Sequence, residues 1–193
     1  MVAGKEWDVS EDWSADGRFV VFRRLRHDGS GDLWYLNLQP GAGSEEVPFL
    51  VGPDSDKVGA RLSPDGRLIA YASNQTGRYE VYVREFPAGG GPWQVSTAGG
   101  TQPRWRRDGK EIYYVEGNTL MAAAVETAPR FAVARREPLF QCQGCLEGRT
   151  HQYDVSADGR RFVVVESVAE SRKPAIRVVQ NWFAEFRRPK PSG

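Results

Sequence analysis

The sequence predicts an all-β protein, a β-propeller built from four-stranded antiparallel blades. Three observations predict it. A short motif ending in Asp-Gly occurs four times, spaced 43 to 50 residues apart, at 14–17, 63–66, 106–109 and 156–159. An apolar run follows each copy directly, and a second apolar run follows at a similar distance each time. Repeats of this length made of short strands are typical of propellers, with one blade per repeat.

Each Asp-Gly pair predicts a tight turn, because Asp hydrogen-bonds nearby backbone and Gly accepts positive φ. The strand after the turn is expected to be nearly all apolar, as suits a strand buried on both faces. These strands are expected over 19–22, 68–71, 112–115 and 162–165. A strand before each turn carries, in one register, Trp13, Leu62, Trp105 and Val155.

A third strand and a shorter outer strand complete each predicted unit. The third strands are expected over 33–38, 81–86, 120–125 and 176–179. The outer strands are expected over 47–51, 93–96 and 131–134. After Val179 little chain remains for a fourth outer strand. Residues 181–187 are either a short helix or an extended tail on the last blade.

The whole chain, 1–193, is predicted to be a single partial propeller domain. Its blade repeats are expected at about 7–52, 57–98, 101–141 and 150–188. With 40% apolar residues, 21 Gly and 12 Pro, the composition suits a turn-rich β protein.

Charge and hydropathy exclude some classes of partner. The net charge is +1, which gives no chain-wide electrostatic footprint for nucleic acid. A local basic cluster of Arg104, Arg106, Arg107 and Lys110 is interpreted as a solvated turn. No apolar stretch reaches the roughly 20 residues of a membrane span, and residues 1–6 do not resemble the start of a signal peptide.

Cys142 and Cys145 form a C-x-x-C motif, with His151 six residues further on. Three interpretations stay open: two inert thiols, a local disulfide, or ligands of a metal ion. A structural zinc ion needs four ligands, and the chain holds two Cys and two His in different repeats. We therefore expect neither a metal nor a cofactor.

A catalytic set is not expected either. Nucleophilic catalysis commonly pairs a Ser or Cys with a His, and the second His, His27, lies in a distant repeat. The repeat serines Ser14, Ser63 and Ser156 suit a turn-capping role, and a G-x-S-x-G elbow is lacking. The chain is predicted not to be an enzyme.

Four charged residues share one register, four positions before the Asp of each repeat: Asp12, Arg61, Arg104 and Asp154. The innermost strand of a blade lines the central channel of a propeller, so these side chains are expected to face it. Two interpretations stay open, a polar site for a ligand or a charge network that holds the blades together.

Several stretches resemble a known family. Residues SADGRFVVF (14–22), 63–86 and SADGRRFVVVES (156–167) resemble the TolB-like, WD-repeat-like propellers of bacteria. The stretch WQVSTAGGTQPRWRRDGKEIYY (93–114) is similar to the C-terminal propeller of some bacterial serine/threonine protein kinases, and 178–188 resembles the way those chains end.

The resemblance implies a non-catalytic binding or sensing module in an extracytoplasmic setting. It implies a protein, peptide or small-ligand partner at the channel mouth, with any kinase activity in a separate N-terminal domain. The alternative is a substrate-gating propeller of a prolyl-oligopeptidase-like peptidase.

Complete propellers of this kind have about six to eight blades. We therefore expect either missing N-terminal blades or self-association, as in a homodimer, or closure of the four blades on themselves. The segment around Trp7 is predicted to pair with the last unit.

Overall fold

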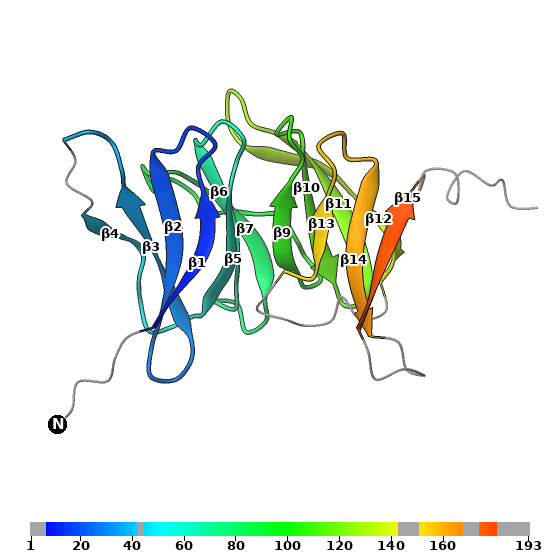
Figure 1. Cartoon of the computed structure of the whole chain (residues 1–193), viewed down its shortest axis with the longest axis horizontal. Helices are drawn as coiled ribbons and strands as arrows, with labels where there is room; N and C mark the ends of the chain where they lie inside the picture. The colour runs from blue at the N-terminus through cyan, green and yellow to red at the C-terminus, as the bar shows by residue number, and fades with distance from the viewer. Residues whose placement is uncertain (1–6, 42–44, 143–150, 168–173, 181–193) are drawn as a thin grey trace, which may run out of the picture.

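The computed structural model describes residues 7–41, 45–142, 151–167 and 174–180. In these ranges the chain forms four antiparallel sheets that stand side by side, without a helix, which confirms the predicted all-β class (Figure 1). The described residues accordingly contain no helix that could cross a bilayer.

Each strand pairs with the next one along the chain within its sheet. The first sheet contains β1 (Trp7–Trp13), β2 (Phe19–Leu25), β3 (Gly31–Asn37) and β4 (Glu46–Leu50). The second contains β5 (Lys57–Leu62), β6 (Leu68–Ser73), β7 (Glu80–Glu85) and β8 (Trp93–Gln94). The third contains β9 (Thr101–Trp105), β10 (Glu111–Glu116), β11 (Thr119–Glu126) and β12 (Ala132–Gln141). The fourth contains β13 (Tyr153–Val155), β14 (Arg161–Ser167) and β15 (Pro174–Gln180).

The predicted strands overlap with these, although β12 is longer than the outer strand expected over 131–134 and β8 is shorter than the one expected over 93–96. The fourth sheet has three strands within the described ranges. The helix or tail predicted at 181–187 lies outside the described residues.

The first Asp-Gly copy shows how the repeat fixes its turn. The Ser14 hydroxyl donates to Asp16 Oδ1 at 2.7 Å and accepts from Phe19 N at 2.9 Å. Asp16 also accepts from Arg18 N at 3.0 Å. This backbone bond, followed by the Ser14 bond, lowers the pKa of Asp16 to about 2. Gly17 has a φ of 75°, a conformation that favours glycine.

The third copy replaces the serine with Arg106. Its guanidinium donates to both carboxylate oxygens of Asp108 at 2.7 Å and lies 2.9 Å from Glu111 Oε2. A bidentate ion pair therefore stabilises this turn where a hydroxyl stabilises the others.

Three core clusters lie between successive sheets. Between the first and second sheets, Phe19 packs against Phe86 with ring centroids 5.2 Å apart. Tyr114 is buried in the middle cluster. Between the third and fourth sheets, Tyr113 packs against Phe162 at 5.1 Å. Each sheet is thus attached to its neighbour by an apolar layer that removes both faces of the inner sheets from water.

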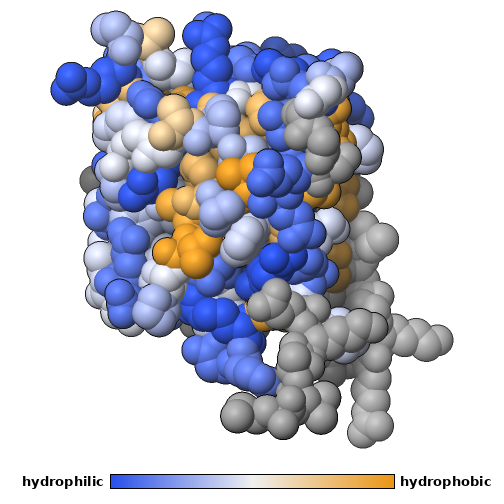
Figure 2. Space-filling model, turned by 90° about the vertical axis from the view of Figure 1, so that its left-hand side faces the viewer, coloured by the Kyte–Doolittle hydropathy of each residue, from blue (hydrophilic) through white to orange (hydrophobic). Residues whose placement is uncertain are grey.

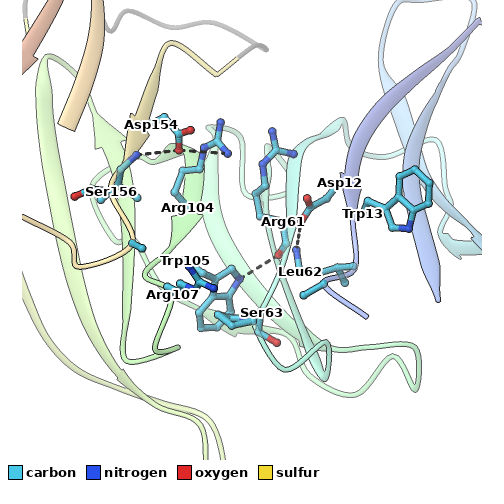
Figure 3. A pocket seen from close by; sticks show the side chains of 14 residues that line it. Asp12, Trp13, Arg61, Leu62, Ser63, Arg104, Trp105, Arg107, Asp154 and Ser156 are labelled. Carbon is cyan, nitrogen blue, oxygen red and sulfur yellow. Dashed lines mark hydrogen bonds and ion pairs between the residues drawn. The ribbon is translucent and has the colours of Figure 1, made fainter. Parts of the chain in front are cut away.

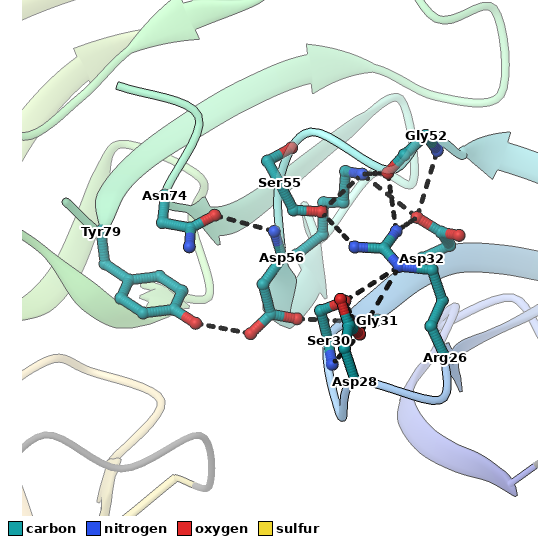
Figure 4. Close-up of polar contacts among 11 residues, drawn as sticks. Arg26, Asp28, Ser30, Gly31, Asp32, Gly52, Ser55, Asp56, Asn74 and Tyr79 are labelled. Carbon is teal, nitrogen blue, oxygen red and sulfur yellow. Dashed lines mark hydrogen bonds and ion pairs between the residues drawn. The ribbon is translucent and has the colours of Figure 1, made fainter. Parts of the chain in front are cut away.

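A buried polar network also links the first two sheets (Figure 4). Asp32 Oδ1 accepts from Arg26 Nη1 at 2.5 Å and from Lys57 Nζ at 3.1 Å. Asp56 accepts from Gly31 N at 2.6 Å, on the opposite sheet. These buried charges are paired and hydrogen-bonded, as burial requires.

None of the core clusters formed by described residues joins the fourth sheet to the first, so the sheets form an open arc (Figure 1). The outer face of β14 leaves Val163 and Val165 41% and 42% exposed. Strand alternation places Val20 and Leu36 on the face of the first sheet opposite Phe19. Figure 2 shows an apolar patch among hydrophilic residues on the side of the molecule where the first sheet lies.

The predicted pairing of the Trp7 segment with the last unit is wrong. Trp7 begins β1, which pairs with β2 of its own sheet, and Trp7 lies opposite Leu25. The segment supplies the inner strand of the first sheet, because the motif beginning at Ser14 needs a preceding strand as the other copies do.

Candidate functional site

A pocket of about 360 Å³ lies where the inner strands β1, β5, β9 and β13 come together (Figure 3). The four register residues Asp12, Arg61, Arg104 and Asp154 all line it. The turn motif fixes the register of each inner strand, so equivalent positions reach the same place. That these residues bind a ligand stays a prediction.

Bulges at the inner strands decide which side chains reach the pocket. The pairing of β1 with β2 shifts between Ser10 and Asp12, and that of β5 with β6 shifts between Val58 and Arg61. A bulge leaves an extra residue unpaired and re-aims its neighbours. As a result Asp12 lines the pocket while the side chain of Glu11, with 6% of its surface exposed, is buried behind it.

Arg61 and Glu11 belong to this buried layer. Glu11 lies 3.8 Å from Arg61 Nη1 and 3.5 Å from Arg23 Nε. Burial raises the pKa of Glu11 to about 7, although both guanidinium groups act to lower it. Sequence reasoning missed Glu11, since simple alternation places it on the face opposite Asp12.

His151 lies against the same layer. Its Nδ1 is 2.9 Å from Arg61 Nη2, and its Nε2 is 3.3 Å from the carbonyl of Pro103. Burial first, then the charges of Arg61 and Arg104, lower the pKa of His151 to about 3. The imidazole is therefore neutral: Nδ1 accepts from Arg61 and the Nε2–H donates to Pro103.

Of the three candidate metal ligands, Cys142 and His151 lie among the described residues. Cys142 is disulfide-bonded and buried, and Cys145 lies outside the described residues. Both nitrogens of His151 have protein partners. Within the described ranges no group of three or more His, Cys, Asp or Glu is placed to hold a metal ion. Of the three interpretations of the motif, the structure supports the disulfide for Cys142.

Side chains also tie each inner strand to the next. Asp12 Oδ2 accepts from Leu62 N at 2.8 Å. Trp105 Nε1 donates to the carbonyl of Arg61 at 3.1 Å, and Tyr153 OH donates to the carbonyl of Gln102 at 2.8 Å. The contacts of Asp12 and most contacts of Arg61 therefore agree with the interpretation of the register residues as a network that holds the sheets together.

The basic cluster divides between two places. Arg104 and Arg107 line the pocket, whereas the guanidinium of Arg106 and the backbone N–H of Lys110 donate to Asp108 in the turn. The interpretation as a solvated turn therefore holds for only part of the cluster. The ring of Trp13, 62% exposed, lies on the outer face of the first sheet and points away from the pocket (Figure 3), and Trp105 is buried in the core.

The serines at the pocket are already engaged. Ser63 and Ser156 donate to Asp65 and Asp158 at 2.6 Å. Each hydroxyl also accepts a backbone N–H, at 2.9 Å and 3.0 Å respectively. They serve the turns, as the sequence predicted.

No family model matches the sequence. Among solved structures, TolB from Acinetobacter baumannii is similar, with a TM-score of 0.63 and 16% identity over 87% of this chain. Puromycin hydrolase is similar with a TM-score of 0.62 and 18% identity over 90% of the chain. The chain has the β-propeller fold.

A study of two prolyl endopeptidases provides a third similar structure, with a TM-score of 0.53 and 15% identity over 91% of this chain. The match covers 39% of the length of the TolB chain, 27% of the puromycin hydrolase chain and 28% of the endopeptidase chain. At these identities the similarity shows a common fold, so the TolB-like prediction is confirmed at the level of the propeller.

Proposed function

We propose that this chain is a non-catalytic binding module, the C-terminal part of a TolB-like propeller, that recognises a protein or peptide at the mouth of its channel. One observation carries the proposal: the pocket gathers charged side chains from all four sheets. Pockets of a few hundred Å³ with a few convergent polar groups are the usual form of a ligand site.

The groups that could perform catalysis there have structural partners. The hydroxyls of Ser63 and Ser156 are bonded within the turns, and the neutral His151 is bonded on both sides. A general base must be free to take a proton from its substrate near neutral pH, and a pKa of about 3 for His151 does not suit that role.

The binding proposal can be tested with two exposed arginines. Arg107 lines the pocket, whereas Arg135 of β12 lies outside it. An array of short capped peptides would be probed with the full chain and with each variant. We expect Arg107→Ala to weaken binding of the captured peptides at least about fivefold, because arginine is a frequent anchor at binding sites, and Arg135→Ala to leave it unchanged. Equal binding by both variants would place recognition elsewhere.

A kinase attachment is proposed from the sequence resemblance at 93–114. The alternative, a substrate-gating propeller of a prolyl-oligopeptidase-like peptidase, is favoured by the similarity to puromycin hydrolase and the prolyl endopeptidases. Reading the gene in frame beyond both ends of the chain separates the two. Kinase motifs upstream support the first, and an α/β-hydrolase sequence downstream supports the second.

A further inference from the structure

The two arginines of the pocket differ in how their guanidinium groups are held. Arg61 Nη1 donates to the carbonyl of Ala60 at 2.7 Å and to that of Glu11, and Nη2 contacts His151. Its side chain is 15% exposed. Arg61 is therefore positioned by the protein on several sides.

Arg104 has no such support. Its closest charged partner is Asp154, whose Oδ1 lies 3.8 Å from Nη1, beyond hydrogen-bond distance. Among the described residues no group accepts a hydrogen bond from its guanidinium, and its Nε is shielded from solvent without a partner. A buried donor left unsatisfied is unfavourable for the folded protein unless something else supplies the acceptor.

The carboxylates of the pocket do not supply that acceptor. Asp12 accepts from Leu62 N, and Asp154 Oδ1 accepts from Val155 N at 2.9 Å with 69% of its side chain exposed. Arg61 and Arg104 also repel each other, because the charge of Arg104 contributes, after burial, to lowering the pKa of Arg61. The pocket therefore has unused donors and positive charge at one place.

We propose that this pocket binds a carboxylate group of its ligand, held by the guanidinium of Arg104. The inference rests on the proposed binding function and adds the chemistry that is recognised. A carboxylate matches the planar guanidinium and accepts two parallel N–H bonds. Figure 3 shows the guanidinium groups of Arg104 and Arg61 extending in the same direction from neighbouring strands, so Arg61 adds a second positive charge beside the bound anion.

The surroundings favour a singly charged group. Asp154 remains beside Arg104 and would repel a doubly charged phosphate more than a carboxylate. Pro64 and Val155 line the same pocket and offer apolar surface to the carbon skeleton of the ligand. The carboxylate can come from an acidic side chain or C-terminus of a peptide, or from a free small acid.

The test uses two probes with the full chain. Propionate and its neutral counterpart propionamide are titrated by saturation-transfer NMR. In parallel, an array displays capped peptides in pairs that differ only by Glu or Gln at one position. We expect propionate and the Glu peptides to bind in preference to their neutral counterparts. Arg104→Gln should weaken propionate binding at least about tenfold, the effect of losing a charge-assisted hydrogen bond.

Two further variants complete the design. Arg135→Gln removes an exposed arginine of β12 outside the pocket and should change nothing. Asp154→Asn removes the carboxylate that competes for Arg104, so propionate binding should become tighter. Because Asp154 is largely exposed, this variant keeps the inference testable even if Arg104→Gln fails to fold.

The outcomes separate the inference from the proposed function. If propionate binds through Arg104 but no peptide does, the carboxylate site stands and the peptide-binding function fails. If peptides bind without preference for Glu and propionate does not bind, the carboxylate inference is overturned while peptide binding stands. Binding of neither probe overturns both, and looser propionate binding by Asp154→Asn contradicts the assigned role of Arg104.

Discussion

The contacts of His151 predict a measurable dependence of stability on pH. The pKa of this imidazole is about 3 in the folded chain and 6.5 in its ordinary state. Below pH 6.5 the unfolded chain therefore binds a proton that the folded chain excludes, and the free energy of unfolding falls as the pH falls. From pH 6.5 to about pH 5 the loss from this one group amounts to about 2 kcal/mol.

Replacing His151 with Gln should remove this contribution. The Gln amide can accept from Arg61 and donate to the carbonyl of Pro103, so the variant keeps the geometry of both contacts. Urea unfolding of both proteins across this pH range gives the measurement. The free energy of unfolding of wild type minus that of the variant should fall by about 2 kcal/mol as the pH falls from 6.5 to 5.

The comparison of wild type with His151→Gln is needed because Glu11 also makes stability depend on pH. Its pKa is raised from 4.5 to about 7, so the folded state binds the extra proton. Its contribution to stability is present below pH 4.5 and is lost as the pH rises through 7. In wild-type protein the slopes of Glu11 and His151 oppose each other, and comparison with the variant isolates the imidazole.

The other histidine of the chain serves as the control. His27 is exposed, so His27→Gln serves to control for the loss of a histidine as such. If the curves of wild type and His151→Gln run parallel from pH 6.5 to 5, the imidazole titrates alike in folded and unfolded chains. The buried contacts with Arg61 and Pro103 would then be refuted.

Three more predictions concern stability measured by denaturant unfolding. Phe162→Ala should lower the free energy of unfolding by about 3–5 kcal/mol, because it leaves a cavity in the core. Val163→Ala, on the exposed face of the same strand, should lower it by less than about 0.5 kcal/mol. Similar losses for both variants would contradict the assignment of the buried and exposed faces of β14. Asp32→Ala removes the carboxylate that Arg26 and Lys57 share and should lower stability by about 3 kcal/mol. An unchanged stability would show that the network is not buried. Ser63→Ala should lower the free energy of unfolding by about 1 kcal/mol. Ser156→Ala should lower it by less, because Ser63 is buried and Ser156 is partly exposed. The reverse order of the two losses would contradict the turn geometry.

The repeat made most of the fold predictable. Each Asp-Gly turn fixes where one strand ends and the next begins, so the register of Asp12, Arg61, Arg104 and Asp154 could be counted along the chain. Side-chain direction near a bulge cannot be counted in this way. Glu11 was missed for that reason.

Long-range placement accounts for the other failures. His151 was grouped with Cys142 because the two are close in sequence, yet it contacts Arg61, 90 residues away. The pairing predicted for Trp7 assumed that an early segment would complete the last sheet. Neither error could be avoided from the sequence, since both depend on how separate sheets lie against one another.

The open arc gives the two ends of the array a different local stability from its middle. Among the described residues, the first and fourth sheets each share a core cluster with one neighbour, whereas the second and third each share clusters with two. In repeat arrays stability is approximately a sum of unit terms and nearest-neighbour terms. Amide protons should therefore exchange fastest in the outermost sheets and slowest in strands such as β6, which is buried along its whole length. Anything that packs on either open face would reverse that gradient at its own end.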